Sequence, residues 1–432
     1  MSIRSMISYI NASGRALMGP IKHSRYCGKL KVKGSFIILR RLSSKDSIPT
    51  DNKKILSKEY KLRSSLEMLI LHYSKQDIPD ITMKTLCDQS QKLSSSYILE
   101  NAKNTVESLI VFNARRLREF RKLPYLVILN PSLSETYSLY LKSMALLVSA
   151  SVSPPKSVQE NSEFIRDVLE QFNEIHTDSL PEISKGFAEV TQFLSVNKVT
   201  TFLDQHLQDR ILMSLIVHQH KELSNSLNSL TFEQGGKFNG VIKLLNIPDV
   251  INKNVELVNN LFMMKYDQSM NVDIETVLHD DNKTYLSDHK DATHPCIEYH
   301  LDYIFTELLK NSFRAQIENK VSTPVKIFVS ISRDPSYIEI KISDQGKGIP
   351  ASTLRHIFDY SFTTYETNEG ESYKTLNVVP GFEGNTVAGM GFGLPLLRNY
   401  IEVFNASAPN YGLLSFQTYN GWGTDVYLKI GG

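Results

Sequence analysis

Three polar residues, Glu307, Asn311 and Arg314, follow one another at intervals of four and three positions. Both intervals fit one face of a helix. An Asn amide oxygen suits a Mg²⁺ ion that takes its other oxygens from phosphates and water, and a carboxylate one turn away suits deprotonation of an attacking hydroxyl. An ordinary solvated helix face is the alternative. The residues whose period predicts this helix, from about residue 299 to about residue 316, are Leu301, Ile304, Phe305, Leu308 and Ser312.

Asp344 stands where a predicted strand leads into Gly346 and Gly348. Alternating apolar and polar residues predict half-buried strands at residues 325–332 and 337–343. A carboxylate at the end of the second strand can accept a hydrogen bond from an adenine amino group, and glycines let the backbone approach the base. A plain strand-to-helix turn is the alternative, because Asp and Gly are common in such turns.

A third segment has glycine at every second position and runs into helical periodicity, with Pro395 suited to the first helical turn. Free backbone amides and the positive end of a helix dipole suit phosphate groups. The spacing is not that of a dinucleotide fingerprint, and no Walker lysine follows, so neither a Rossmann nor a P-loop site is predicted. The segment comprises Gly389, Met390, Gly391, Phe392, Gly393 and Leu394.

In this order, the three motifs resemble the ATP-binding fold shared by bacterial histidine kinases, DNA gyrase, heat-shock chaperone ATPases and mismatch-repair ATPases, the GHKL superfamily. Within it, the chain resembles the mitochondrial kinases of 2-oxoacid dehydrogenase complexes, namely pyruvate dehydrogenase kinase and its branched-chain relative. The resemblance covers most of residues 60–430. The segments that carry it are Glu307–Ala315, Phe358–Thr364, Gly421–Leu428, Leu123–Pro124, Asn130–Pro131, Ser138–Ser143, Phe202–Asp204, Arg210–Ile211 and Gln219–His220.

The resemblance implies a role for each matching residue. Glu307 matches the general base that acts on the substrate serine, and His220 matches a histidine that pairs with this glutamate. For His220, a phosphoacceptor role and a satisfied structural role on an amphipathic helix are the alternatives. Asn311 matches the Mg²⁺ ligand, and Asp344 matches the residue that recognises adenine. The resemblance also implies ATP contacts for Glu307, Asn311 and Asp344. The other residues implied to bind ATP are Arg314, Gly346, Gly348, Thr363, Thr364, the loop from Gly389 to Leu394, and Thr424.

The remaining pattern predicts two domains. Helical periods at residues 95–123, 132–151, 161–196 and 200–226 predict an antiparallel four-helix bundle, with Ser132 and Glu135 as a capping box on the second helix. Periodicity is lost beyond residue 224, which places the junction near residue 240. We therefore expect an N-terminal all-α four-helix bundle over residues 50–240. The resemblance implies a C-terminal α/β sandwich of the GHKL, histidine-kinase-like type over residues 241–432.

The first 45 residues contain ten Lys or Arg and no Asp or Glu. This pattern predicts a mitochondrial presequence at residues 1–42 and a mature chain in the mitochondrial matrix, with a flexible nucleic-acid-binding arm as the alternative. Without those ten charges, 48 Lys and Arg against 46 Asp and Glu become 38 against 46, a net charge of −8. An acidic body argues against nucleic acid as the main partner.

Further features limit the class of protein. The three cysteines have no spacing typical of a disulfide framework or a zinc site. No apolar run approaches the roughly 20 residues of a transmembrane helix. A basic run at the end of the first predicted helix is interpreted as a solvated face that complements the helix dipole, or as a contact for an acidic partner. It comprises Arg115, Arg116, Arg118, Arg121 and Lys122.

The resemblance implies a serine protein kinase that uses ATP and Mg²⁺ to phosphorylate and inactivate the dehydrogenase (E1 alpha) subunit of the pyruvate dehydrogenase complex. It also implies contact with lipoyl domains of the complex core, and a homodimer or a heterodimer with a paralogue. Segments 130–131 and 138–143 favour the pyruvate complex, whereas 358–364 favours the branched-chain kinase as the alternative. A regulatory ATPase and a non-catalytic scaffold are alternatives of another class. The chain stops at Gly432 without the extended tail of pyruvate dehydrogenase kinases. The sequence therefore supports the expected lipoyl-domain contact and dimer mode less strongly than it supports ATP binding.

Overall fold

The computed structural model describes residues 60, 64–176, 179–229, 232–280, 283–286, 291–360 and 393–432. The predicted presequence lies outside these residues. So do Thr363, Thr364 and the first four residues of the glycine loop, Gly389 to Phe392.

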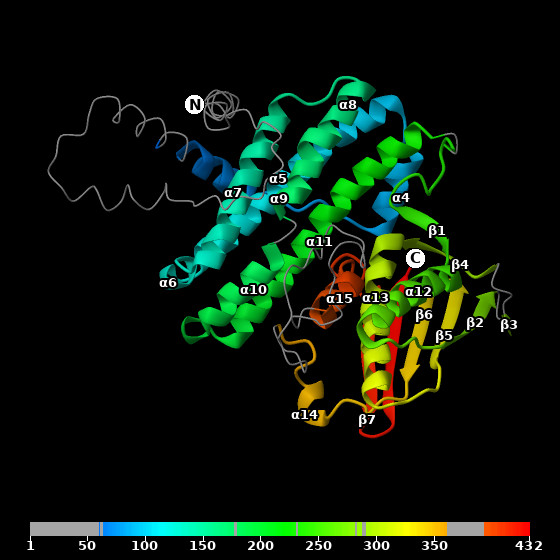
Figure 1. The fold of residues 1–432 in the computed structure, drawn as a ribbon. Coiled ribbons are helices and arrows are strands. Elements are labelled where there is room, and N and C mark those ends of the chain that lie inside the picture. Colours follow the sequence, from blue (N-terminus) through cyan, green and yellow to red (C-terminus); the bar gives the residue numbers. More distant parts are fainter. Residues whose placement is uncertain are drawn as a thin grey trace.

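The N-terminal half of the described chain is helical, and two long helices, α5 and α11, cross it (Figure 1). Helix α5 packs against α7 and α11, and α7 packs against α10. Among the described helices, none is long and apolar enough to cross a membrane. The elements are α4 (Met83–Gln91), α5 (Ser95–Lys122), α6 (Tyr125–Ile128), α7 (Pro131–Val152), α8 (Val158–Phe164), a π-helical segment (Ile165–Glu170), α9 (Gln171–His176), α10 (Ser179–Glu189), a 3₁₀ turn (Thr191–Phe193) and α11 (Val196–Leu227).

Two expectations for this half are corrected. The cap of α7 is Asn130, whose Oδ1 accepts hydrogen bonds from the backbone amides of Ser132 and Leu133 at 3.0 and 3.3 Å. Pro131 occupies the first turn, so the helix begins ahead of the predicted capping box at Ser132. The single helix predicted over residues 161–196 is divided into α8, a π-helical segment, α9 and α10.

The C-terminal half contains a six-stranded sheet in the order β3-β2-β5-β6-β8-β7. Strands β2 and β5 are parallel, and the other neighbouring pairs are antiparallel. Strands β1 and β4 form a separate antiparallel pair. The strands are β1 (Ile242–Asn246), β2 (Val272–Asp280), β3 (Lys283–Leu286), β4 (Thr293–Ile297), β5 (Val325–Arg333), β6 (Ser336–Asp344), β7 (Gly412–Tyr419) and β8 (Gly423–Gly431).

Helices α12 (Ile247–Tyr266), α13 (Glu298–Glu318) and α15 (Gly393–Glu402) cover one face of this sheet, and the short helix α14 (Ala351–Leu354) follows β6 (Figure 1). The inward-facing residues of β5 and β6 are buried against the helices, as their alternation predicts. The predicted α/β architecture of this half is therefore confirmed, with α13, β5 and β6 close to their expected bounds.

Helix α11 contributes to two apolar cores. Its residues Leu207, Ile211 and Leu215 join the core beneath the sheet, whereas Met213 and Val217 join the core of the helical half. One helix thus ties the two halves together, because alternate faces of it are buried in different cores.

Candidate functional site

Glu307 lies on α13 between a lysine and the start of α15. The ammonium group of Lys310 donates a hydrogen bond to Glu307 Oε1 at 2.6 Å, and the side chains of Lys310 and Glu307 are only 10% and 12% exposed. The other carboxylate oxygen faces Gly393, where a Cβ atom would lie 2.5 Å from Glu307 Oε2. Any side chain at Gly393 would therefore displace the carboxylate. The structure thus brings together Glu307 and the last glycine of the predicted phosphate loop.

Lys310 is a site residue that the sequence motifs alone do not identify. Its signal is the i,i+3 spacing from Glu307, which places the two charges side by side on a helix. A cation that holds one carboxylate oxygen fixes the orientation of the other.

Asn311 and Arg314 lie on the outward side of α13, as their spacing predicts. Asn311 is exposed, whereas its neighbours Ser312 and Phe313 are buried. Arg314 Nε donates to Glu318 Oε1 at 2.7 Å in a pair whose acidic side chain is 51% exposed. Only the acidic partner is largely exposed, because the Arg314 side chain itself is 20% exposed.

Asp344 ends β6 with its carboxylate buried and held by backbone amides. The amides of Gly346 and Thr424 donate to Asp344 Oδ1 at 2.9 and 3.3 Å. Thr424 is its partner in the register of β6 with β8. Burial raises the pKa of Asp344 to about 6, and the two backbone hydrogen bonds lower it only in part. The site therefore holds a desolvated carboxyl with one oxygen fixed from behind.

Two glycines let this turn approach its neighbours. A Cβ atom at Gly346 would lie 2.8 Å from the Cβ of Ala315, so glycine allows the end of β6 to dock on α13. At Gly348 the φ angle is +77°, and a side chain would clash with the carbonyl oxygen of Tyr419. The Asp344 turn and the helix of Asn311 are consequently in direct contact.

The expected pairing of His220 with Glu307 is wrong for this structure. His220 is fully buried on α11, with Nδ1 2.7 Å from Asn101 Oδ1 and Nε2 2.9 Å from Asn161 Oδ1. These asparagines lie on α5 and α8, so the imidazole faces the helical half. Burial lowers the pKa of His220 to about 4, which keeps the ring neutral.

Gly393 and Leu394 open α15, as predicted from the glycine pattern. The remaining implied contacts, Thr363, Thr364 and Gly389 to Phe392, lie outside the described residues. Within the described part of the chain, no group of three His, Cys, Asp or Glu side chains is arranged to hold a metal ion. Cys87 and Cys296 are free cysteines.

Two family models match this chain. Residues 80–243 match the model of the mitochondrial branched-chain alpha-ketoacid dehydrogenase kinase, and residues 296–430 match the model of the histidine kinase-, DNA gyrase B-, and HSP90-like ATPase. The second range contains Glu307, Asn311 and Asp344, and the first contains His220.

Among curated proteins, the chain is similar to mitochondrial [pyruvate dehydrogenase (acetyl-transferring)] kinase 1 of Saccharomyces cerevisiae. The two are 29% identical over 383 residues, which covers 86% of this chain and 89% of the yeast protein. Human kinase isozyme 1 is 25% identical over 337 residues, covering 75% and 71% of the two chains. Mouse kinase isozyme 4 is 26% identical over 334 residues, covering 75% and 74%.

Proposed function

We propose that this chain is an ATP-dependent protein-serine kinase acting on the pyruvate dehydrogenase complex. The proposal starts from the family, because the chain belongs to the mitochondrial 2-oxoacid dehydrogenase kinase family of the GHKL superfamily. The observation that carries the proposal is the position of Glu307. Its carboxylate is held by Lys310 on one side and meets the start of α15 at Gly393 on the other. A base thus stands where the glycine loop ends.

The chemistry follows from these residues. Glu307 accepts the proton of the substrate serine hydroxyl, while Lys310 holds its carboxylate in one orientation. Bound ATP supplies the phosphoryl group that is transferred. The first amides of α15 and the positive end of its dipole favour phosphate oxygens beside Gly393 and Leu394. Because phosphoryl transfer depends mainly on positioning and charge neutralisation, no covalent nucleophile is needed.

Within the proposed site, adenine is assigned to Asp344 and Mg²⁺ to Asn311. Asp344 accepts a hydrogen bond from the adenine amino group through the oxygen that Gly346 and Thr424 leave available. Asn311 is the side chain that would hold Mg²⁺, since its exposed amide lies one turn from Glu307 on the same helix. The further ATP contacts proposed from the family are Arg314, Gly348, Thr363, Thr364 and the loop from Gly389 to Phe392.

Partners and location are proposed on the same basis. The similar yeast, human and mouse proteins are named mitochondrial kinases of pyruvate dehydrogenase. Together with the basic first 45 residues, these names support a matrix kinase whose substrate is the dehydrogenase subunit. Contact with lipoyl domains, a dimeric assembly and a four-helix bundle within the helical half belong to the same proposal.

A second candidate substrate is the branched-chain 2-oxoacid dehydrogenase complex. It is favoured by the family model that matches residues 80–243, whose description names the branched-chain kinase. A regulatory ATPase would use the same carboxylate, Glu307, to activate water for ATP hydrolysis. A scaffold would catalyse neither ATP hydrolysis nor protein phosphorylation.

One assay separates these functions. The chain from residue 43 onward is incubated with radiolabelled ATP, Mg²⁺ and each purified dehydrogenase complex. Phosphoserine on the pyruvate complex, with loss of its dehydrogenase activity, supports the proposal. Labelling of the branched-chain complex alone supports the second candidate, and release of free phosphate alone supports an ATPase. The absence of both labelled protein and free phosphate supports a scaffold. Chelation of Mg²⁺ is expected to abolish labelling.

A further inference from the structure

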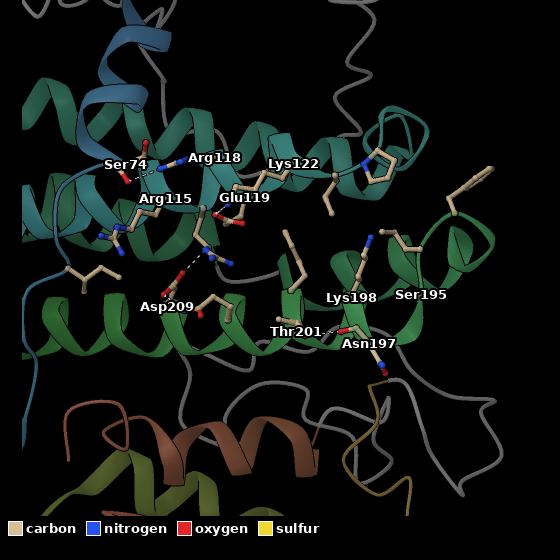
Figure 2. Close-up of a pocket in the computed structure, with 18 of the residues that line it drawn as sticks. Ser74, Arg115, Arg118, Glu119, Lys122, Ser195, Asn197, Lys198, Thr201 and Asp209 are labelled. Carbon is tan, nitrogen blue, oxygen red and sulfur yellow. Dashed lines mark hydrogen bonds and ion pairs between the residues drawn. The ribbon is translucent and has the colours of Figure 1, made fainter. Parts of the chain in front are cut away.

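A large groove lies in the helical half, on the side of α11 that faces away from α15 (Figure 2). It has a volume of about 1200 Å³ and is walled by the end of α5, residues 74–78 and the first half of α11. Figure 2 shows Ser74, Arg115 and Arg118 toward one end of it and Asn197 and Lys198 toward the other. None of its lining residues belongs to the nucleotide site described above.

The groove is strongly positive. Its lining contains four more positive than negative side chains, whereas the chain beyond residue 45 carries a net charge of −8. The concentration of positive charge is therefore a local feature that runs against the charge of the molecule. The cations are Lys75, Arg115, Arg116, Arg118, Lys122 and Lys198, and the carboxylates are Glu119 and Asp209.

Much of this charge is not neutralised within the protein. Arg115 Nε donates to the backbone carbonyl of Gln76 at 3.2 Å. Arg118 donates to the carbonyl of Ser74 at 3.5 Å. A carbonyl accepts a hydrogen bond but carries no net charge, so both guanidinium groups keep their attraction for an anion. Lys75 and Lys198 are exposed.

Arg116 adds a buried donor to the lining. Its side chain is 4% exposed, and its Nε lies 2.5 Å from Asp209 Oδ2. Within the described protein, its Nη1 is buried without a hydrogen-bond acceptor. This finding corrects the interpretation of the basic run as a solvated face, since Arg116 is buried, is paired with Asp209, and has an Nη1 that lacks an acceptor.

The groove also has apolar lining. Phe193 is 44% exposed, and Leu123, Pro124 and Leu194 line the same space. A ligand that fits the whole groove therefore needs several carboxylates and an apolar side chain. The volume exceeds the roughly 300–1,000 Å³ typical of small-molecule pockets, which favours a chain segment over a small anion.

We propose that this groove docks an acidic peptide segment of a protein partner. An extended peptide with several Asp or Glu residues and one apolar residue matches both the charge and the apolar lining. The apolar lining and the acidic remainder of the molecule favour such a peptide over a nucleic acid.

The test is fluorescence anisotropy with a short labelled peptide in which Glu alternates with Ser around a central Leu. The same peptide with Gln in place of Glu is the ligand control. The test variant carries Lys75→Gln and Lys198→Gln, which removes two exposed groove charges. The matched control carries Lys84→Gln and Lys326→Gln, two exposed lysines outside the groove.

We expect the wild type and the control variant to bind the Glu peptide equally, with affinity falling as salt rises. The groove variant should bind roughly tenfold more weakly, as expected for two partly screened charge contacts. Equal binding by the two variants, equal affinity for the Gln peptide, or no binding by the wild type would each overturn the proposal. A single-stranded oligonucleotide that binds more tightly than the Glu peptide, and loses affinity with the same two lysines, would also overturn it.

Discussion

At the scale of single residues, we expect the rate of serine phosphorylation to depend most strongly on Glu307. Replacing it by Gln keeps the shape of the side chain but removes the proton acceptor, so we expect serine phosphorylation to fall by roughly 10²–10⁴-fold. ATP binding should persist, because the assigned adenine and phosphate contacts do not use this carboxylate. A radiolabelled phosphotransfer assay with calorimetry of ATP binding measures both quantities.

The control is Glu298→Gln, which removes the same charge from the first turn of the same helix. Glu298 pairs with Lys253 on its exposed side, so its loss should leave phosphorylation nearly unchanged. A Glu307→Gln enzyme with the wild-type rate would show that another group accepts the proton.

Asp344 makes nucleotide binding depend on pH. Burial raises its pKa to about 6, so the free site becomes protonated as pH falls from 7 to 5. A hydrogen bond from adenine favours the ionised carboxylate, and ATP affinity should therefore decline over this range. The effect on folding has the opposite sign to that of a salt-bridged carboxylate. The ionised form of Asp344 lowers stability above pH 6, and this cost vanishes below the ordinary aspartate pKa of 3.8.

The Asp344→Asn variant separates the titration of Asp344 from that of the ATP phosphates, because the variant lacks the titrating carboxyl group. The variant should bind ATP about tenfold or more weakly at pH 7.5, since a hydrogen bond to a charged group is worth about 1.5–3 kcal/mol. The ratio of wild-type to variant affinity, measured by calorimetry, should fall toward one at pH 5. A ratio independent of pH would remove Asp344 from adenine recognition.

At the scale of elements, His220 joins three helices. Its two ring nitrogens lie within hydrogen-bond distance of Asn101 on α5 and Asn161 on α8, while its backbone belongs to α11. His220→Ala should lower the free energy of unfolding by about 2–4 kcal/mol, because it leaves a cavity and removes the partner of two buried amides. Chemical denaturation measures this loss, and ATP affinity should remain.

His218→Ala is the matched change on the same helix. His218 Nδ1 lies 2.8 Å from the carbonyl of Ser214 on its own helix, so its removal should cost less stability. The pH dependence gives a second readout. Because the folded-state pKa of His220 is about 4, its contribution is fully present above pH 6.5 and is lost as pH falls toward 4. An equal loss for both variants would contradict the bridging role.

These elements also show what the sequence could predict. The periods of α13, β5 and β6 are local, so they placed Glu307 and Asp344 correctly at a helix face and a strand end. Periodicity says which face of a helix is buried but not which neighbour covers it. The partners of His220 and the burial of Arg116 against Asp209 depend on packing between distant segments. Gly393 could be predicted to open a helix, but not to meet Glu307.

At the scale of the whole molecule, α11 connects the two halves by a polar contact as well as by its apolar faces. Asp204 on α11 accepts a hydrogen bond from the hydroxyl of Tyr360, and Arg398 of α15 lies 3.2 Å from the same carboxylate oxygen. Burial raises the pKa of Tyr360 well above its usual value, so the hydroxyl keeps its proton and donates it. The same stretch of α11 lines the basic groove at Thr201, Gln205 and Asp209.

If this contact couples the halves, Asp204→Ala and Tyr360→Phe should not act independently on stability. Each removes the same hydrogen bond, so the double variant should be less destabilised than the sum by about 1–3 kcal/mol. Denaturant unfolding of the four proteins in the cycle gives this coupling energy. The control cycle pairs Tyr360→Phe with Asp273→Ala, an exposed residue of β2, and should be additive. Additivity in both cycles would mean that the halves are joined by the apolar faces of α11 alone.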